Sequence, residues 1–337
     1  SHPVLWGVYI TNFVFWVGIA HSGTLISAVL FLFRARFRMS IYRIAEAMTV
    51  FAVATAGLFP IIHLGRPWNF YWLLPYPNQR GLWVNFDSPL LWDVFAVSTY
   101  ATISSVFFFI GMIPDIAAIR DTVVGKAKKV FYSVASLGWK GSSWEWGHYT
   151  RAYFYFACFA TPLVISVHSV VSWDFAMANT PGWHTTIFPP YFVAGAIFSG
   201  LAMVITLCIP LRYIFKLEDY ITMDNFDGMS KMIILTSSIV FYAYLIEFFI
   251  AWYSGNKYEY DQFIYRAVGD YALFYWIMMF CNGIVPHLLW FKKIRHNLMI
   301  LFIITLLINI GMWFERFNII VISLSKEFEP GSWGLYK

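Results

Sequence analysis

The sequence predicts an all-α integral membrane protein with eight transmembrane helices arranged as two four-helix bundles. Of the 337 residues, 60% are hydrophobic and 12% are charged, whereas about 25% are charged in an average soluble domain. Aromatic residues reach 21%, which is typical of the Trp and Tyr belts at membrane surfaces. Eight apolar runs are long enough to span a bilayer, since a spanning helix needs about 20 residues.

The eight runs follow one another with polar connections between them. They cover residues 5–33, 45–63, 90–113, 152–173, 191–215, 231–252, 271–291 and 298–322. The longest connections are 64–89 and 114–151, and the spans divide four and four. We therefore expect a first bundle over 1–175, a second over 176–325 and a C-terminal tail over 326–337.

Positive charge predicts the orientation of the spans. Sixteen of the 23 Lys and Arg residues fall on one side of the eight spans and seven on the other. The positive-inside rule makes the first side cytoplasmic, so both chain ends and the loops 64–89 and 173–190 face the periplasm. In a protein surrounded by a lipid bilayer, the net charge of +5 does not indicate nucleic acid, and no such partner is predicted.

The cysteines and histidines predict no redox cofactor bound by this chain. Cys158, Cys208 and Cys281 lie in apolar runs, without C-x-x-C or C-x-x-C-H spacing, which iron–sulfur clusters and c-type haems need. A bis-histidine haem needs two histidines at matched depth, whereas His63 ends a span and His21 lies toward the inner half of another. We expect no haem, iron–sulfur cluster or metal site.

A histidine and an aspartate flank the first long outer loop. His63 ends the second apolar run and Asp93 lies just inside the third. Charge inside a bilayer costs roughly 2.5–3.5 kcal/mol or more, so a base and an acid at one depth favour a proton-accepting site. In the alternative interpretation, the pair only ties the loop to the helix. Between them, we expect Arg66 to pair with Asp87, Asp93 or a partner subunit, and Trp68 to anchor at the interface.

Further ionisable residues in the spans are candidates for a proton path. They are His21, His168, Asp174 and Glu247. Each has a structural alternative, because polar side chains also hydrogen-bond neighbouring membrane helices. Glu315 and Arg316 are adjacent, and adjacent side chains diverge by about 100° on a helix, so we expect them to serve different neighbours, in a structural ion-pair role.

Four stretches resemble the NrfD-like family, the membrane subunit of polysulphide reductase and related respiratory complexes. They are residues 60–68 (PIIHLGRPW), 88–93 (SPLLWD), 167–174 (VHSVVSWD) and 181–195 (PGWHTTIFPPYFVAG). Over residues 1–325 the chain is most similar to the ActC quinol-binding subunit of bacterial alternative complex III. That subunit is expected to have ten spans, so either flanking helices lie outside this sequence or the chain is a shorter member.

The resemblance implies a quinol site near the periplasmic surface of the first bundle, in the bacterial inner membrane. His63 and Asp93 would bind the quinol or menaquinol substrate, with Arg66 and Trp68 beside it. Electrons would pass to an iron–sulfur cluster subunit and on to c-type cytochrome subunits, next to a paralogous NrfD-like membrane subunit, and protons would be released or translocated. The alternatives are a quinone-reducing anchor of a polysulphide-reductase or molybdoenzyme-type complex, and a secondary transporter.

Overall fold

The computed structural model describes residues 6–63 and 65–326, and for His63 it describes the backbone alone. Within these ranges the secondary structure is helical, without strands. The α-helices are α1 (Gly7–Thr24), α2 (Leu30–Leu32), α3 (Tyr42–His63), α4 (Pro89–Thr122), α5 (Lys126–Ala135), α6 (Ser143–Ala176), α7 (Phe188–Ile214), α8 (Met223–Tyr253), α9 (Lys257–Val268), α10 (Ala272–Met279), α11 (Lys292–Arg295), α12 (Leu298–Phe317) and α13 (Ser323–Ser325). The predicted all-α class is confirmed.

Eight of the described helical segments are long and apolar enough to cross a membrane, as predicted. Three of them contain π-helical stretches, which have wider turns. A π-helical stretch over Leu25–Val29 joins α1 to α2, and another over Asn318–Ile322 joins α12 to α13. The seventh span is α10 continued through Phe280–Ile284 and Val285–Trp290.

Helices α4 and α6 are longer than the apolar runs that predicted them. Each has 34 residues, or about 50 Å at 1.5 Å per residue, against a hydrocarbon core of about 30 Å. Helix α4 continues past Ile113 through Pro114. Helix α6 begins at a capping box formed by Ser142 and Glu145, nine residues before the predicted start of its span at 152. Both extensions carry charged residues, so the hydropathy of the sequence assigned these segments to loops.

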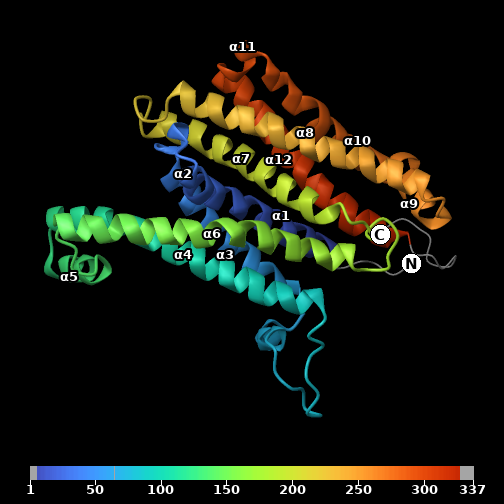
Figure 1. Cartoon of the computed structure of the whole chain (residues 1–337), viewed down its shortest axis with the longest axis horizontal. Coiled ribbons are helices and arrows are strands. Elements are labelled where there is room, and N and C mark those ends of the chain that lie inside the picture. The colour runs from blue at the N-terminus through green and yellow to red at the C-terminus, as the bar shows by residue number, and fades with distance from the viewer. Residues whose placement is uncertain (1–5, 64, 327–337) are drawn as a thin grey trace.

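The eight spans form two groups, α1, α3, α4 and α6 in one and α7, α8, α10 and α12 in the other (Figure 1). Helix α7 packs against α1 and α6 and also against α8 and α12. The α3–α4 and α6–α7 connections and helix α9 lie at one end of the molecule, here called the outer end (Figure 1). Helices α5 and α11 lie at the opposite, inner end (Figure 1).

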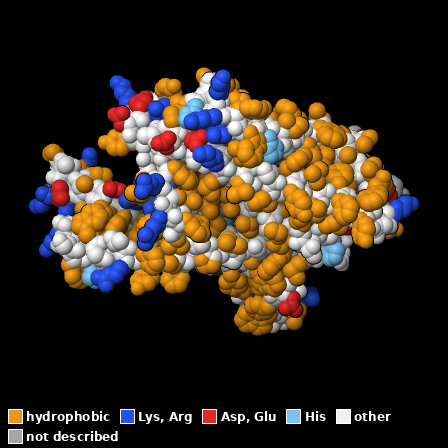
Figure 2. All heavy atoms as spheres, turned by 45° about the horizontal axis from the view of Figure 1, so that its top comes forward, with side chains coloured by type: hydrophobic (Ala, Val, Ile, Leu, Met, Phe, Trp, Pro, Cys, Tyr) orange, Lys and Arg blue, Asp and Glu red, His pale blue; other side chains and the backbone are white. Residues whose placement is uncertain are grey.

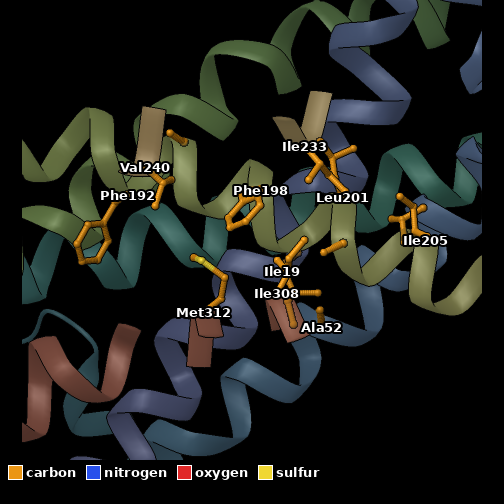
Figure 3. Close-up of a cluster of buried hydrophobic side chains, with 14 of the residues drawn as sticks. Ile19, Ala52, Phe192, Phe198, Leu201, Ile205, Ile233, Val240, Ile308 and Met312 are labelled. Atoms are coloured by element: carbon orange, nitrogen blue, oxygen red, sulfur yellow. The ribbon is translucent and has the colours of Figure 1, made fainter. Parts of the chain in front are cut away.

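One apolar core runs through both groups. Ile19 of α1, Ala52 of α3 and Ile308 of α12 gather around Phe198 and Leu201 of α7 (Figure 3). The second group therefore packs on the first through α7. The division of the chain into two domains at 175/176 stays a prediction, and residues 327–337 of the predicted tail lie outside the described residues.

The surface agrees with a bilayer around the middle of the molecule. Hydrophobic side chains cover the central zone of the face seen in Figure 2, and Lys and Arg side chains gather mostly at the inner end. The exposed apolar side chains of the spans include Phe51, Phe109, Phe159 and Leu235. Exposed apolar surface of this extent fits lipid contact.

Candidate functional site

The first polar cluster lies where the start of α4 meets the end of α6, at the outer end. Asp93 follows the first turn of α4 and is 8% exposed. Its carboxyl group adjoins that of Asp174, in the last turn of α6. The preceding residues also meet, because the Trp92 and Trp173 rings are 5.8 Å apart in an edge-to-face contact. Two adjoining buried carboxyl groups do not both ionise, because their like charges repel each other, so one of them holds a proton.

Each carboxyl group of this pair keeps a free acceptor. The Oδ1 atoms of Asp93 and Asp174 are buried without a hydrogen-bond partner among the described residues. Buried polar atoms are normally satisfied, so two unsatisfied oxygens on adjoining carboxyl groups indicate a place where a hydroxyl-bearing ligand or water binds. The pair can hold one proton and accept another hydrogen bond.

The remaining predicted quinol-site residues lie on the connection between α3 and α4. Helix α3 ends at His63, whose side chain lies outside the described part of the chain. Gly65 has a φ of +71°, a left-handed backbone conformation that glycine adopts at little cost. Arg66 is exposed and forms no ion pair with Asp87 or Asp93 in the described structure. Trp68 is 70% exposed. The structure therefore brings Asp174, and not Arg66 or Trp68, to Asp93.

Two histidines that are far apart in the sequence meet inside the first group of helices. The His21 and His168 ring centroids are 4.3 Å apart, and His21 stacks on Tyr100 at 4.6 Å. Both histidines are fully buried. Nε2 of His21 and both ring nitrogens of His168 have no hydrogen-bond partner among the described residues. The rings touch, so they do not lie on opposite faces of one haem as axial ligands would.

Tyr100 connects the histidines to further polar groups. Its hydroxyl bonds Thr24 Oγ1 at 2.7 Å and donates to the Ala20 carbonyl at 2.8 Å. Thr49 Oγ1 donates to the same carbonyl at 2.8 Å. Tyr100 could not be singled out from the sequence, because one tyrosine among 21 gives no signal until its neighbours are known.

A buried acid near the inner end is likewise absent from the residues predicted from the sequence. Glu46 of α3 is 3% exposed, accepts a hydrogen bond from Tyr153 at 2.7 Å and forms an ion pair with Arg43 at 3.5 Å. It is the second residue of the predicted span 45–63 and follows the charged segment 34–43, so its burial was not evident from the sequence. The general rule that buried acids in spans are functional suspects applies to it.

The second group of helices contains the ion pair of Glu315 and Arg316. Both are buried on α12 and contact each other directly. The expected structural ion-pair role is therefore confirmed, while the expectation that each residue serves a different neighbour is wrong for this contact. The long arginine side chain reaches its neighbour on the same helix, and both charges are shielded from solvent. Arg316 also lies over the Phe192 ring, 4.5 Å from its centroid, and Tyr244 donates a hydrogen bond to Glu315.

Glu247 lies one turn from Tyr244 on α8 and is 7% exposed. Its Oε1 has no hydrogen-bond partner among the described residues. It lines a cavity of about 190 Å³ at the outer end. Thus the predicted proton-path residues fall into separate places, His21 with His168, Asp174 with Asp93, and Glu247 alone in the second group.

The loop between α6 and α7 is held by Gly182, which lies in the most specific of the family-like stretches. Its N–H donates to Glu259 at 2.8 Å and its carbonyl accepts from Arg266 at 3.1 Å. Its φ is +84°, and a Cβ would lie 2.8 Å from Arg266 Nη2 and 3.0 Å from Gln262 Cγ. Only glycine satisfies both the backbone and the space.

We expect Gly182→Ala to lower the free energy of unfolding by about 1–3 kcal/mol, because it adds backbone strain and crowding at a buried arginine. Thermal unfolding of the purified protein in detergent measures it. Gly255→Ala is the matched control, with a φ of +66° but no atom within 4 Å of the added Cβ. Equal losses in the two variants would contradict a role for crowding.

Comparison with known proteins agrees with the membrane architecture. The family model of polysulphide reductase, NrfD, matches residues 1–325. A protein of Halobacterium salinarum, named as a membrane subunit of dimethyl sulfoxide reductase, is 26% identical over 205 residues. That alignment covers 60% of this chain and 43% of the relative, so the chain matches less than half the length of that protein. The family match extends over all eight spans, and the chain is therefore a member of the NrfD family, a family of membrane subunits of redox enzyme complexes.

Proposed function

We propose that this chain is the quinol-oxidising membrane subunit of a respiratory complex, with its quinol site at the outer end of the first four-helix group. The observation that carries the proposal is the carboxyl pair of Asp93 and Asp174, with a buried, unpartnered oxygen on each. A quinol hydroxyl is a hydrogen-bond donor that must lose its proton as electrons leave. The pair offers an acceptor for the hydrogen bond and a place for the proton.

His63 is proposed to bind the second quinol oxygen from the end of α3. It follows Ile62 at the outer end of its helix, the end at which α4 begins. A histidine suits this role because it changes protonation near neutral pH. Arg66 and Trp68 are proposed to act at the mouth of the site, since both are exposed on the connection from α3 to α4.

Protons and electrons leave the quinol separately. The buried cluster of His21, His168 and Tyr100 is proposed to take up or relay protons within the first group. The electrons are proposed to pass to an iron–sulfur subunit at the periplasmic side and then to c-type cytochromes, as in alternative complex III. The cysteine spacing favours this division of labour, because it lacks the cluster and c-type haem patterns.

A second candidate keeps the same site with a different partner. The halobacterial relative is named as a dimethyl sulfoxide reductase membrane subunit, which favours a molybdoenzyme and iron–sulfur partner exchanging electrons with quinone. Purification of the native complex separates the two. A multihaem cytochrome c in the complex supports the first candidate, and a molybdopterin subunit supports the second.

We expect Asp93→Asn in the assembled complex to lower quinol oxidation by about a hundredfold, because an amide cannot take a proton. Turnover of a short-chain menaquinol with ferricyanide as acceptor measures it. Asp87→Asn, at an exposed position of the same connection, is the matched control and should keep wild-type turnover. Wild-type turnover in Asp93→Asn, at equal complex assembly, would refute the quinol site.

A further inference from the structure

A second polar site lies in the other half of the molecule, away from the quinol site. The α6–α7 loop, the end of α8 and helix α9 lie together at the outer end (Figure 1). Residues of these three segments line a cavity of about 190 Å³. Its lining includes His184, Glu247, Asn256 and Glu259. It has room for several water molecules, since one needs about 10–15 Å³.

Specific hydrogen bonds hold the α6–α7 loop, which lines this cavity on one side. Gly182 is clamped between Glu259 of α9 and the buried Arg266, and the neighbouring Trp183 donates to the Ile319 carbonyl at 2.6 Å. The loop is thereby tied to both α9 and the end of α12. These contacts fix the position of the loop that lines one side of the cavity.

Glu247 joins this cavity to a smaller one deeper in the protein. The smaller cavity has about 10 Å³, room for about one water. Glu247 and Phe263 line both cavities, and the inner one also reaches Tyr244 and Arg266. Arg266 donates to Gly182 and to Ser323 Oγ at 2.6 Å, and the described structure contains no ion pair between Arg266 and Glu247.

Beyond the inner cavity the polar groups continue to the centre of the second group. Tyr244 precedes Glu247 by three residues, so both lie on one face of α8. Its hydroxyl donates to Glu315, and Asn282 donates to that hydroxyl at 3.0 Å. Glu315 in turn pairs with Arg316. The Glu247 carboxyl, the Tyr244 hydroxyl and the Glu315 carboxyl thus follow one another from the outer cavity to the buried ion pair.

We propose that Glu247 binds and releases protons through the outer cavity, and that it forms the outer end of a proton route through Tyr244 to Glu315. The proton enters or leaves by water at the cavity mouth, and no covalent bond to a heavy atom changes. A purely structural glutamate would have both oxygens satisfied by protein groups, whereas Oε1 of Glu247 faces none. This inference rests on the proposed function, because quinol oxidation would supply the energy that moves the proton.

The test uses proteoliposomes that contain the whole complex. It measures how many protons are released for each quinol oxidised, that is, for each pair of electrons transferred. A pH-sensitive dye follows protons released during oxidation of a short-chain menaquinol by ferricyanide. We expect the wild-type complex to release more than the two protons that the quinol carries, and Glu247→Gln to release only those two. Glu247→Asp, which keeps the carboxyl group, should restore most of the difference, and Glu218→Gln, an exposed acid on the connection between α7 and α8, should match the wild type.

An equal ratio in wild type and Glu247→Gln would overturn the proposal, whatever its value. The ratio is taken per quinol oxidised, so a changed turnover rate does not alter it. The quinol site is tested independently by the turnover of Asp93→Asn. If Glu247→Gln fails to assemble, dicyclohexylcarbodiimide, which modifies protonated carboxyl groups in apolar surroundings, replaces it. Modification of Glu247 with a lowered ratio supports the route, and an unmodified Glu247 or an unchanged ratio overturns it.

Discussion

Replacement of Arg316 by methionine is expected to destabilise the protein by about 3–5 kcal/mol, because it leaves the buried Glu315 carboxylate without its cation. Both residues are at most 2% exposed. The variant also removes the cation over the Phe192 ring. Thermal unfolding in detergent measures the loss, together with the yield of assembled complex.

The double variant Glu315→Gln with Arg316→Met is the control that identifies the cause. It removes both charges, and the glutamine oxygen can still accept the hydrogen bond from Tyr244. Removing a buried ion pair whole is often close to neutral, whereas removing one partner is not. The double variant should therefore recover most of the stability. If it is as unstable as Arg316→Met alone, packing rather than unpaired charge explains the loss.

The spans were predictable because the physical demand on them is simple. A chain in hydrocarbon must present about 20 apolar residues and satisfy its backbone within one helix, and every predicted run corresponds to one of the eight spans. Helices outside the membrane follow another rule. Helix α5 and the inner extension of α6 carry charged faces, so hydropathy alone assigned them to loops.

The ionisable residues of the candidate site could be predicted from the sequence, but the contacts between them could not. The cost of charge in a bilayer singled out Asp93, Asp174, His21 and His168 one by one. Their pairing depends on how α4, α6 and α1 cross, which involves positions about 80 or more residues apart in the chain. The error over Glu315 had a different origin. The angle between adjacent positions describes only the directions in which the two side chains leave the helix. A long arginine side chain can reach well beyond its starting direction, and that reach decides which groups meet in a buried interior.

Gly23 is where one added methyl group should disturb the first group of helices most. Its Cβ would lie 1.9 Å from Thr49 Oγ1 and 2.2 Å from the Ala45 carbonyl oxygen on α3. Small residues let membrane helices approach this closely. We expect Gly23→Ala to cost about 1–3 kcal/mol or more, since α1 and α3 must separate. Replacing Thr49 as well should not rescue it, because the second contact is backbone.

Gly57→Ala on α3 is the matched control for Gly23→Ala. No atom lies within 4 Å of its added Cβ, and alanine is favoured over glycine in a helix by about 1 kcal/mol. That variant should unfold at the wild-type temperature or above. Because His21 lies two residues before Gly23, separation of α1 from α3 should also pull His21 from Tyr100 and His168, and quinol turnover should fall with stability. Wild-type stability in Gly23→Ala would mean that α1 and α3 do not approach as closely as their backbones indicate.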